Sequence, residues 1–105
     1  MVNINIPETD GYMSVAYELA KLASSRGEVP IGAVIIDRSN GSMLAGDHNR
    51  VKEYGDSLAH AEMLVLREAI RVRRTPRLIN CDLYVTLEPC AMCAGAISLL
   101  SLIHI

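Results

Sequence analysis

The chain has 105 residues, of which 50% are hydrophobic and 21% are charged, and its formal net charge is −2. This length and composition predict one globular domain and exclude a disordered chain, which needs lower hydrophobicity and a higher net charge. The acidic balance argues against a broadly basic surface for nucleic acid, although it leaves room for a local basic patch.

The cysteines and the apolar segments indicate the compartment. Three cysteines are present, and Cys90 and Cys93 are three positions apart, which does not fit the even disulfide set of a small secreted chain. Residues 1–7 lack the basic start and the long apolar stretch of a signal peptide. The longest apolar run, 96–105, is far short of the ~20 residues that span a bilayer. We therefore expect a soluble cytoplasmic protein with reduced thiols and no membrane partner.

The first predicted element is a helix that begins after Asp10, a residue suited to an N-cap, and ends before Gly27. Its apolar residues recur at helical spacing, namely Tyr12, Ala16, Leu19, Ala20 and Ala23. The apolar run 31–36 then predicts a buried strand, and Asn-Gly in the segment 38–42 predicts the turn of a hairpin.

The second half of the chain begins with a return strand from Met43 and a polar segment, 47–56, that we interpret as a loop. Ser57 is suited to cap a second helix. The buried side of that helix carries Ala59, Met63, Leu66 and Ile70, and Pro76 follows its end. Residues 81–87 alternate as a strand does, and Pro89 opens a third helix. The order helix, strand, strand, helix, strand, helix predicts an α/β sheet covered by helices.

Residue types that can bind zinc stand at the starts of the second and third predicted helices. Zinc prefers nitrogen and sulfur ligands, and a catalytic site has three protein ligands with one open position. Cys90 and Cys93 share one helix face, and the first turn of a helix favours thiolates. With His60 they complete a ligand set, so we predict one Zn²⁺ per chain.

A carboxylate is needed beside such a metal. The open position would hold a water whose pKa falls from about 15.7 towards 7. A leaving amine must be protonated as it departs, and a carboxylate can take the proton of the water and pass it on. Glu62 is the candidate for this role. Residues at i and i+2 do not share a helix face, so Glu62 has to reach towards the metal from the start of the helix.

Each part of this pattern has a simpler explanation when it is taken alone. A His-x-Glu at a helix start needs no function, and a Cys-x-x-Cys is also typical of redox sites. A redox role for the cysteines leaves His60 and Glu62 unused. Cys81 is expected to be a small buried hydrophobe. A structural zinc site would need a fourth protein ligand, from Cys81, His48 or His104.

A cluster of basic residues lies in the segment 67–77. It consists of Arg67, Arg71, Arg73, Arg74 and Arg77. One interpretation is the solvated end of a helix, where cations are favoured. The other is contact with the phosphates of a nucleic acid, and the sequence leaves both open.

The combination of motifs is more specific than its parts. H-x-E followed by P-C-x-x-C is the known signature of zinc deaminases. On this signature and on further matching stretches, the chain resembles the cytidine/deoxycytidylate-type zinc deaminases, and among them the bacterial tRNA-specific adenosine deaminases, up to about Ile97. The matching stretches are 28–34, Asn49-Arg50, 60–62 and 83–96.

The resemblance implies a cytidine-deaminase-like three-layer α/β/α sandwich with a mixed sheet. It also implies a homodimer that converts adenosine to inosine at the wobble position of tRNA, with the anticodon loop or other single-stranded nucleic acid as partner. By motif position, Asn49 would lie against the flipped nucleotide, Val29 and Ile31 would wall the base pocket, and the main chain of Ala61 would contact the base or the metal water. The zinc ligands would be His60, Cys90 and Cys93, and Glu62 would be the proton shuttle.

The chain departs from this family at its end, where members continue with two more strands and further helices. We expect a single deaminase domain, 1–105, that is shortened after the third helix and lacks the C-terminal strands and helices of the sandwich. The alternatives are a deaminase of a free base or nucleoside, such as guanine, cytosine or cytidine, and an inactive zinc-binding fragment.

Overall fold

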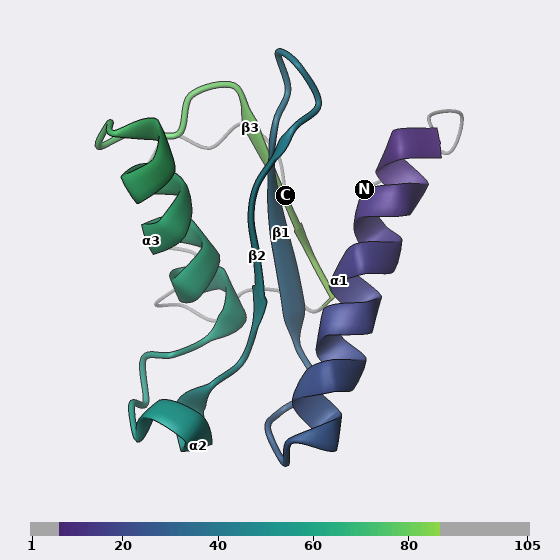
Figure 1. Ribbon diagram of the computed structural model, residues 1–105, viewed down its shortest axis with the longest axis vertical. Helices are drawn as coiled ribbons and strands as arrows, with labels where there is room; N and C mark the ends of the chain where they lie inside the picture. The colour runs from purple at the N-terminus through teal and green to yellow at the C-terminus, as the bar shows by residue number, and fades with distance from the viewer. Residues whose placement is uncertain (1–6, 87–105) are drawn as a thin grey trace.

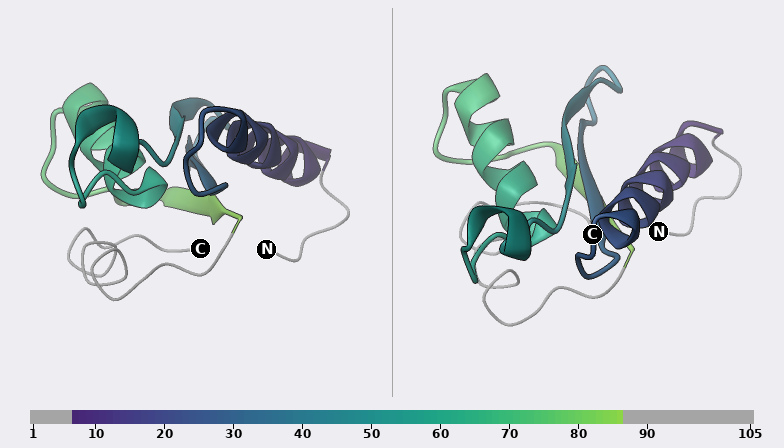
Figure 2. Two further views of the ribbon diagram at one scale, coloured as in Figure 1. Left: turned by 90° about the horizontal axis from the view of Figure 1, so that it is seen from below. Right: turned by 60° about the horizontal axis from the view of Figure 1, so that its bottom comes forward.

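The computed structural model describes residues 7–86. In chain order the elements are α1 (Pro7–Ser25), β1 (Gly32–Asp37), β2 (Met43–His48), α2 (Val51–Tyr54), α3 (Ala61–Arg73) and β3 (Cys81–Val85). A sheet stands between two helices, with α1 on one face and α3 on the other (Figure 1 and Figure 2). The three predicted layers are therefore present in this part of the chain.

The sheet has the strand order β2-β1-β3, and both strand pairs are antiparallel. Strand β1 lies at the centre, and its first five residues are all buried. Such a continuous buried run is expected where helices cover both faces of a sheet. Gly32 pairs with His48, so the start of β1 and the end of β2 lie side by side.

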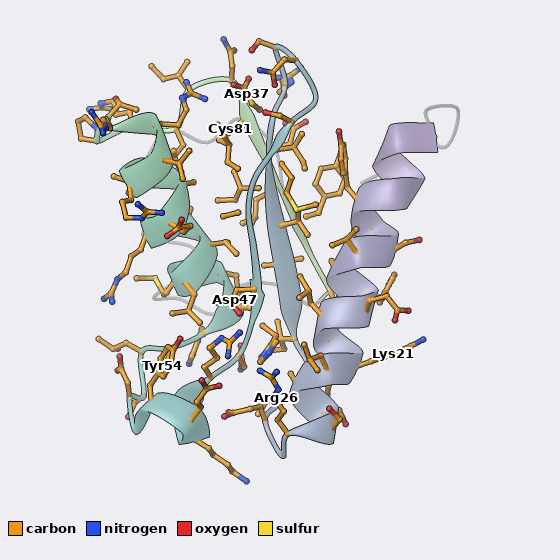
Figure 3. All side chains as sticks on the ribbon, viewed as in Figure 1. Lys21, Arg26, Asp37, Asp47, Tyr54 and Cys81 are labelled. Atoms are coloured by element: carbon orange, nitrogen blue, oxygen red, sulfur yellow. The ribbon has the colours of Figure 1, made fainter. Side chains whose placement is uncertain are left out.

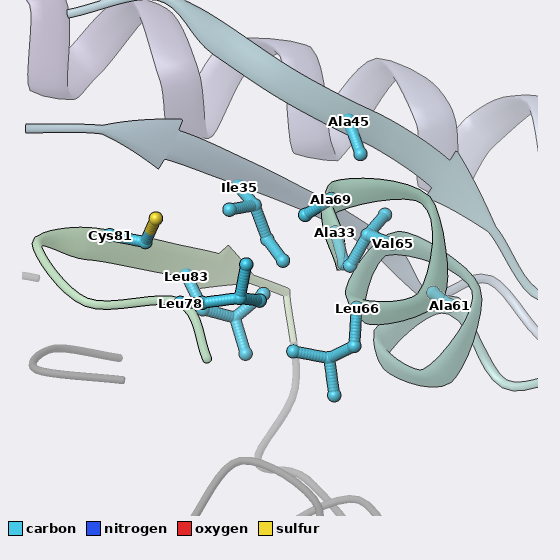
Figure 4. Packing of buried hydrophobic residues seen from close by; sticks show 10 residues of the cluster. All are labelled: Ala33, Ile35, Ala45, Ala61, Val65, Leu66, Ala69, Leu78, Cys81 and Leu83. Atoms are coloured by element: carbon cyan, nitrogen blue, oxygen red, sulfur yellow. The ribbon is translucent and has the colours of Figure 1, made fainter. Parts of the chain in front are cut away.

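Alternate residues of the strands face the two helices. Ile35 and Leu83 pack with Val65 and Leu66 in the cluster between the sheet and α3 (Figure 4). On the other face, Val34, Ile36 and Tyr84 pack with Ala16 of α1. The Tyr84 ring meets the Tyr12 ring edge-on, with 5.5 Å between centroids. The predicted alternation of the third strand is confirmed, and α1 covers its second face.

Helix α1 approaches β1 closely at Gly32. A Cβ atom on this glycine would lie 2.0 Å from the carbonyl oxygen of Ala16 and 2.8 Å from the backbone nitrogen of Ala20. No side chain fits at such distances, so the absence of a side chain is what allows the contact. The small residues of the predicted helical stripe lie where the helix meets the sheet.

The structure confirms the predicted hairpin and the predicted third strand, which is β3. It also confirms that the first helix ends before Gly27, whose φ is 76°. The predicted start of the first helix is wrong, because α1 begins at Pro7 and Asp10 lies inside it. Proline suits a first helical position, since its φ is already helical and its missing N–H is not needed there. The predicted third helix from Pro89 lies outside the described residues.

Two further boundaries differ from the prediction. The segment 47–56 is not only a loop, because β2 extends to His48 and a short helix occupies Val51–Tyr54. Ser57 does not cap the next helix, which begins at Ala61 with His60 as its N-cap residue. Both differences arise from contacts between distant parts of the chain, described below. None of the helices within residues 7–86 has the length and apolar character needed to cross a membrane.

Candidate active site

The described site residues gather at the end of the sheet where α1 finishes and α3 begins. Asn49 directly follows β2, and residues 60–62 form the start of α3. In Figure 3 this is the lower end of the molecule, where Arg26 is labelled. Cys90 and Cys93, the two predicted thiolate ligands, lie outside the described residues.

A hydrogen bond joins Asn49 to the first turn of α3. The backbone N–H of Ala61 donates to Asn49 Oδ1 at 2.8 Å, and both residues are buried. An N–H group needs an acceptor, so the amide oxygen of Asn49 faces the helix and its NH₂ group lies on the opposite side of the amide. The side chain of Asn49 therefore has a fixed orientation, and it holds the helix start against the end of β2.

His60 precedes the first helical residue. Its backbone is extended (φ −76°, ψ 149°), and its side chain makes no capping hydrogen bond to α3. The His60 N–H donates to the Leu58 carbonyl at 2.8 Å, and its own carbonyl accepts the Leu64 N–H at 3.0 Å. The backbone is thus fixed on both sides. Because Asn49 supplies the cap, the imidazole is not needed for it.

Glu62 carries a buried oxygen without a partner in the described part of the chain. The residue is 3% exposed, and Oε1 has no hydrogen bond to any group in residues 7–86. Asp82 Oδ1 shares this state, but Arg38 Nε lies 3.6 Å from it, so an ion pair compensates its charge. Burying a carboxylate oxygen without a partner costs free energy. Glu62 is therefore a group that stability alone does not explain.

The donors that the structure describes fit a catalytic metal centre. Within residues 7–86, no group of three or more His, Cys, Asp or Glu side chains could hold a metal ion. His60 and Glu62 are the described part of the predicted set. An imidazole that does not cap the helix, and a buried carboxylate two residues along the chain whose Oε1 lacks a hydrogen-bond partner among residues 7–86, are residue types suited to a metal ligand and a proton-transfer group.

His48 is a buried residue that the sequence suggested only as a possible fourth ligand of a structural zinc site. Its Nδ1 lies 2.7 Å from the Asn49 carbonyl oxygen, and its Nε2 lies 3.3 Å from Arg26 Nη1. A carbonyl can only accept and a guanidinium can only donate, so Nδ1 carries the proton and the ring is neutral. The only signal in the sequence is its position at the inward-facing end of β2.

The geometry disfavours a structural zinc site with four protein ligands. Both ring nitrogens of His48 already have partners. Cys81 is fully buried near Asp37, at the opposite end of the sheet from the start of α3 (Figure 3). Burial raises the pKa of the Cys81 thiol, as expected for the buried hydrophobe that the sequence predicts. The remaining candidate, His104, lies outside the described residues.

A pocket of about 440 Å³ opens beside Asn49 and His60. Residues 27–29 form one wall, and Asn49, Val51 and Lys52 form the other. Val29 lines the pocket and is 56% exposed, whereas Ile31 packs against the core cluster. A larger hollow of about 590 Å³, between β2 and α3, contains none of the predicted site residues. The candidate site is therefore assigned from the residue types that line the smaller pocket and not from the volume of the pocket.

Two members of the basic cluster are engaged within the molecule. Arg71 forms an exposed ion pair with Glu68. Arg73 contacts Asp37 Oδ2 and Cys81 Sγ, each at 3.4 Å. Arg73 therefore joins the end of α3 to β1 and β3. For these two residues the contacts favour the helix end over phosphate contact, although Arg73 is partly buried in an internal ion pair and not fully solvated.

Comparison with known proteins agrees with the geometry. The zinc-binding region of cytidine and deoxycytidylate deaminases matches residues 7–104. The chain belongs to this deaminase family. Among its relatives, the tRNA-specific adenosine deaminase of Bacillus subtilis is 52% identical over 88 residues, which cover 84% of this chain and 53% of the relative.

Two solved structures have the same fold. A chain from a study of A-to-I editing by tRNA:A34 deaminases at the wobble position of transfer RNA is 45% identical, with a TM-score of 0.86, over 90% of this chain and 72% of that one. Guanine deaminase from Bacillus subtilis is 34% identical, with a TM-score of 0.85, over 90% of this chain and 60% of that one. The chain spans 53–59% of the length of the curated relatives from Bacillus subtilis, Aquifex aeolicus and Rickettsia bellii.

Proposed function

We propose that this chain carries the site of a zinc-dependent hydrolase that converts adenosine to inosine at the wobble position of a tRNA anticodon. The observation that carries the proposal is the buried Oε1 of Glu62, which has no partner within residues 7–86 and lies two residues from His60. The similarity to tRNA-specific adenosine deaminases supports this substrate over other bases.

In this proposal His60, Cys90 and Cys93 hold one zinc ion. When bound, the metal supplies a Lewis acid that lowers the pKa of a water molecule towards about 7. Glu62 Oε1 would accept one proton from the water and deliver it to the ring nitrogen, and it would then accept the second proton from the newly added hydroxyl and deliver it to the departing amine. Water and adenosine give inosine and ammonia, so Glu62 returns to its starting state.

The pocket beside Asn49 would receive the base. Because its oxygen is held by Ala61, Asn49 can offer only its NH₂ group, which suits an acceptor atom of the nucleotide. Val29 would supply an apolar wall. A deaminase needs its base out of the stack, and an anticodon loop presents unpaired bases. In this proposal the protein is a homodimer and acts in the cytoplasm.

Metal analysis combined with an inosine assay on tRNA tests the proposed function. We expect close to one zinc per chain and inosine formation by the unaltered protein. Glu62→Gln should keep the zinc and lower turnover by about 10²- to 10⁴-fold, the usual contribution of a proton-transfer group. Glu68→Gln, an exposed carboxylate on the same helix, is the control and should keep full turnover. Unchanged turnover in Glu62→Gln would remove Glu62 from the reaction.

A deaminase of a free base is the second candidate, because guanine deaminase has nearly the same structural similarity. The two functions separate when the same preparation is offered tRNA, single-stranded DNA, guanine, cytosine and free nucleosides. Turnover of small molecules alone would reject the tRNA proposal. Zinc binding without turnover of any of these substrates would identify an inactive zinc-binding fragment.

A further inference from the structure

Glu28 is a buried carboxylate that the proposed chemistry does not use. It is 7% exposed and lies in the short connection between α1 and β1. Its Oε1 accepts the backbone N–H of Lys52 at 3.0 Å, and its Oε2 accepts the backbone N–H of Glu53 at 2.8 Å. Both oxygens are therefore bonded to one short segment that lies 24 and 25 residues further along the chain.

These two bonds supply a cap that α2 does not have locally. Arg50 is the N-cap residue of α2, and its side chain makes no capping hydrogen bond. Lys52 and Glu53 are the second and third helical residues, whose N–H groups a capping side chain normally bonds. A helix of four residues is not stable by itself in water, because nucleation is unfavourable. Glu28 therefore contributes to holding α2 in place.

The same bonds join the two walls of the pocket beside Asn49. Glu28 and Val29 belong to one wall, and Val51 and Lys52 belong to the other. The Asn49 N–H donates to the Ile31 carbonyl at 3.2 Å, which fixes one end of the second wall. Beyond that point, the Glu28 carboxylate bridges the two walls at Lys52 and Glu53. A change at Glu28 would alter the width of the pocket without touching His60 or Glu62.

We propose that Glu28 is a positioning residue for the substrate pocket, which caps α2 from the opposite wall and so fixes the pocket that receives the base. This inference rests on the proposed function in one respect, namely that the pocket beside Asn49 binds the substrate. The role predicts an effect on substrate binding rather than on the proton transfers. A residue important only for folding would lower the active fraction, and hence kcat, and leave KM unchanged.

The test compares Glu28→Gln and Glu28→Ala with the unaltered chain, and Glu68→Gln is the matched control. Glutamine keeps one acceptor oxygen but places an NH₂ group against a backbone donor, and alanine removes both acceptors. We expect KM for an anticodon stem-loop RNA with adenosine at the wobble position to rise about tenfold in Glu28→Gln. We expect kcat to change less than threefold and the zinc content to stay the same. Glu28→Ala should show a larger rise in KM, and if it does not fold, Glu28→Gln decides.

Amide hydrogen exchange provides a measurement that needs no substrate. In Glu28→Gln the amides of Lys52 and Glu53 should exchange at least tenfold faster, while the amides of α3 keep their rates. Unchanged exchange at these amides, or faster exchange with an unchanged KM, would overturn the proposal. If the unaltered protein does not act on RNA, the proposed function fails, and the exchange rates alone then decide the role of Glu28.

Discussion

The 2.8 Å hydrogen bond from the Ala61 N–H to Asn49 Oδ1 links the end of β2 to the start of α3. Asn49→Ala would leave a fully buried N–H without its acceptor. Because an unsatisfied buried donor costs about 1–3 kcal/mol, we expect the free energy of unfolding to fall by about that amount. Urea denaturation of the two proteins measures this difference.

Asn40 provides the control for this prediction. Its Oδ1 accepts the Ser42 N–H at 2.9 Å in the exposed turn of the hairpin, so the bond has the same kind of donor and acceptor. Water can replace the lost acceptor there, and Asn40→Ala should cost less than about 0.5 kcal/mol. Equal losses in the two variants would show that the bond at Asn49 has no special place in the fold.

The regular elements could be predicted because their patterns are local. The alternation of residues 81–85 and the Asn-Gly turn reflect which side chains face the core, and the structure agrees. The start of α3 could not be predicted in this way. Local capping rules pointed to Ser57, whereas the acceptor comes from Asn49, twelve residues before Ala61 in the chain. Only the folded chain brings that acceptor to the helix.

The sequence predicts the chemistry of the candidate site, but it does not predict the residues that hold the site in place. His60 and Glu62 carry a motif, and residue types alone indicate their role. Glu28 begins a stretch that matches the family and His48 lies outside the matching stretches, but neither residue type indicates its role, because that role depends on backbone groups brought close only by folding. The basic cluster could not be resolved from the sequence either, since Arg73 finds its partner Asp37 at a separation of 36 residues.

Gly32 makes a sharp steric prediction. In Gly32→Ala, the new methyl group would collide with the backbone of α1 at Ala16 and Ala20, and a backbone cannot move aside as a flexible side chain can. We expect a loss of about 3 kcal/mol or more in the free energy of unfolding, at the upper end of the cost of overpacking. Thermal unfolding followed by circular dichroism measures it.

Gly46 is the matched glycine in the neighbouring strand. A Cβ there would lie 3.4 Å from Leu19 Cδ1 and from Met43 Sδ, both of which belong to flexible side chains. Gly46→Ala should therefore change the free energy of unfolding by less than about 1 kcal/mol. A small loss in Gly32→Ala would contradict the close contact between α1 and β1.

Arg73 and Arg71 test the interpretation of the basic cluster. Arg73→Met removes the donor that Asp37 and Cys81 share in a half-buried setting, and we expect a loss of about 1–2 kcal/mol. Arg71→Met breaks only an exposed ion pair with Glu68 and should leave the melting temperature unchanged within error. If Arg71→Met alone destabilised the protein, the internal role assigned to Arg73 would be wrong.

The carboxylate of Glu28 predicts how stability depends on pH. Burial raises the pKa of this group, but the hydrogen bonds from the amides of Lys52 and Glu53 and the positive charge of Lys52 together lower it by more, so that the net shift is downward. A lowered pKa means that the folded state binds its proton less readily than the unfolded chain does. The contribution of Glu28 is thus fully present above the unfolded pKa of about 4.3 and is lost as the pH falls through the folded value.

Unfolding curves of the unaltered protein and of Glu28→Gln, recorded from pH 7 to pH 3, isolate this contribution, because Asp37 and Glu68 titrate in both proteins with lowered pKa values. At pH 7 the unaltered protein should be the more stable of the two. As the pH falls below about 4.3, the difference between the free energies of unfolding of the two proteins should shrink. If this difference in the free energy of unfolding stayed constant down to pH 3, the charge of Glu28 would not contribute to capping α2. Only the shape of the side chain would then matter there.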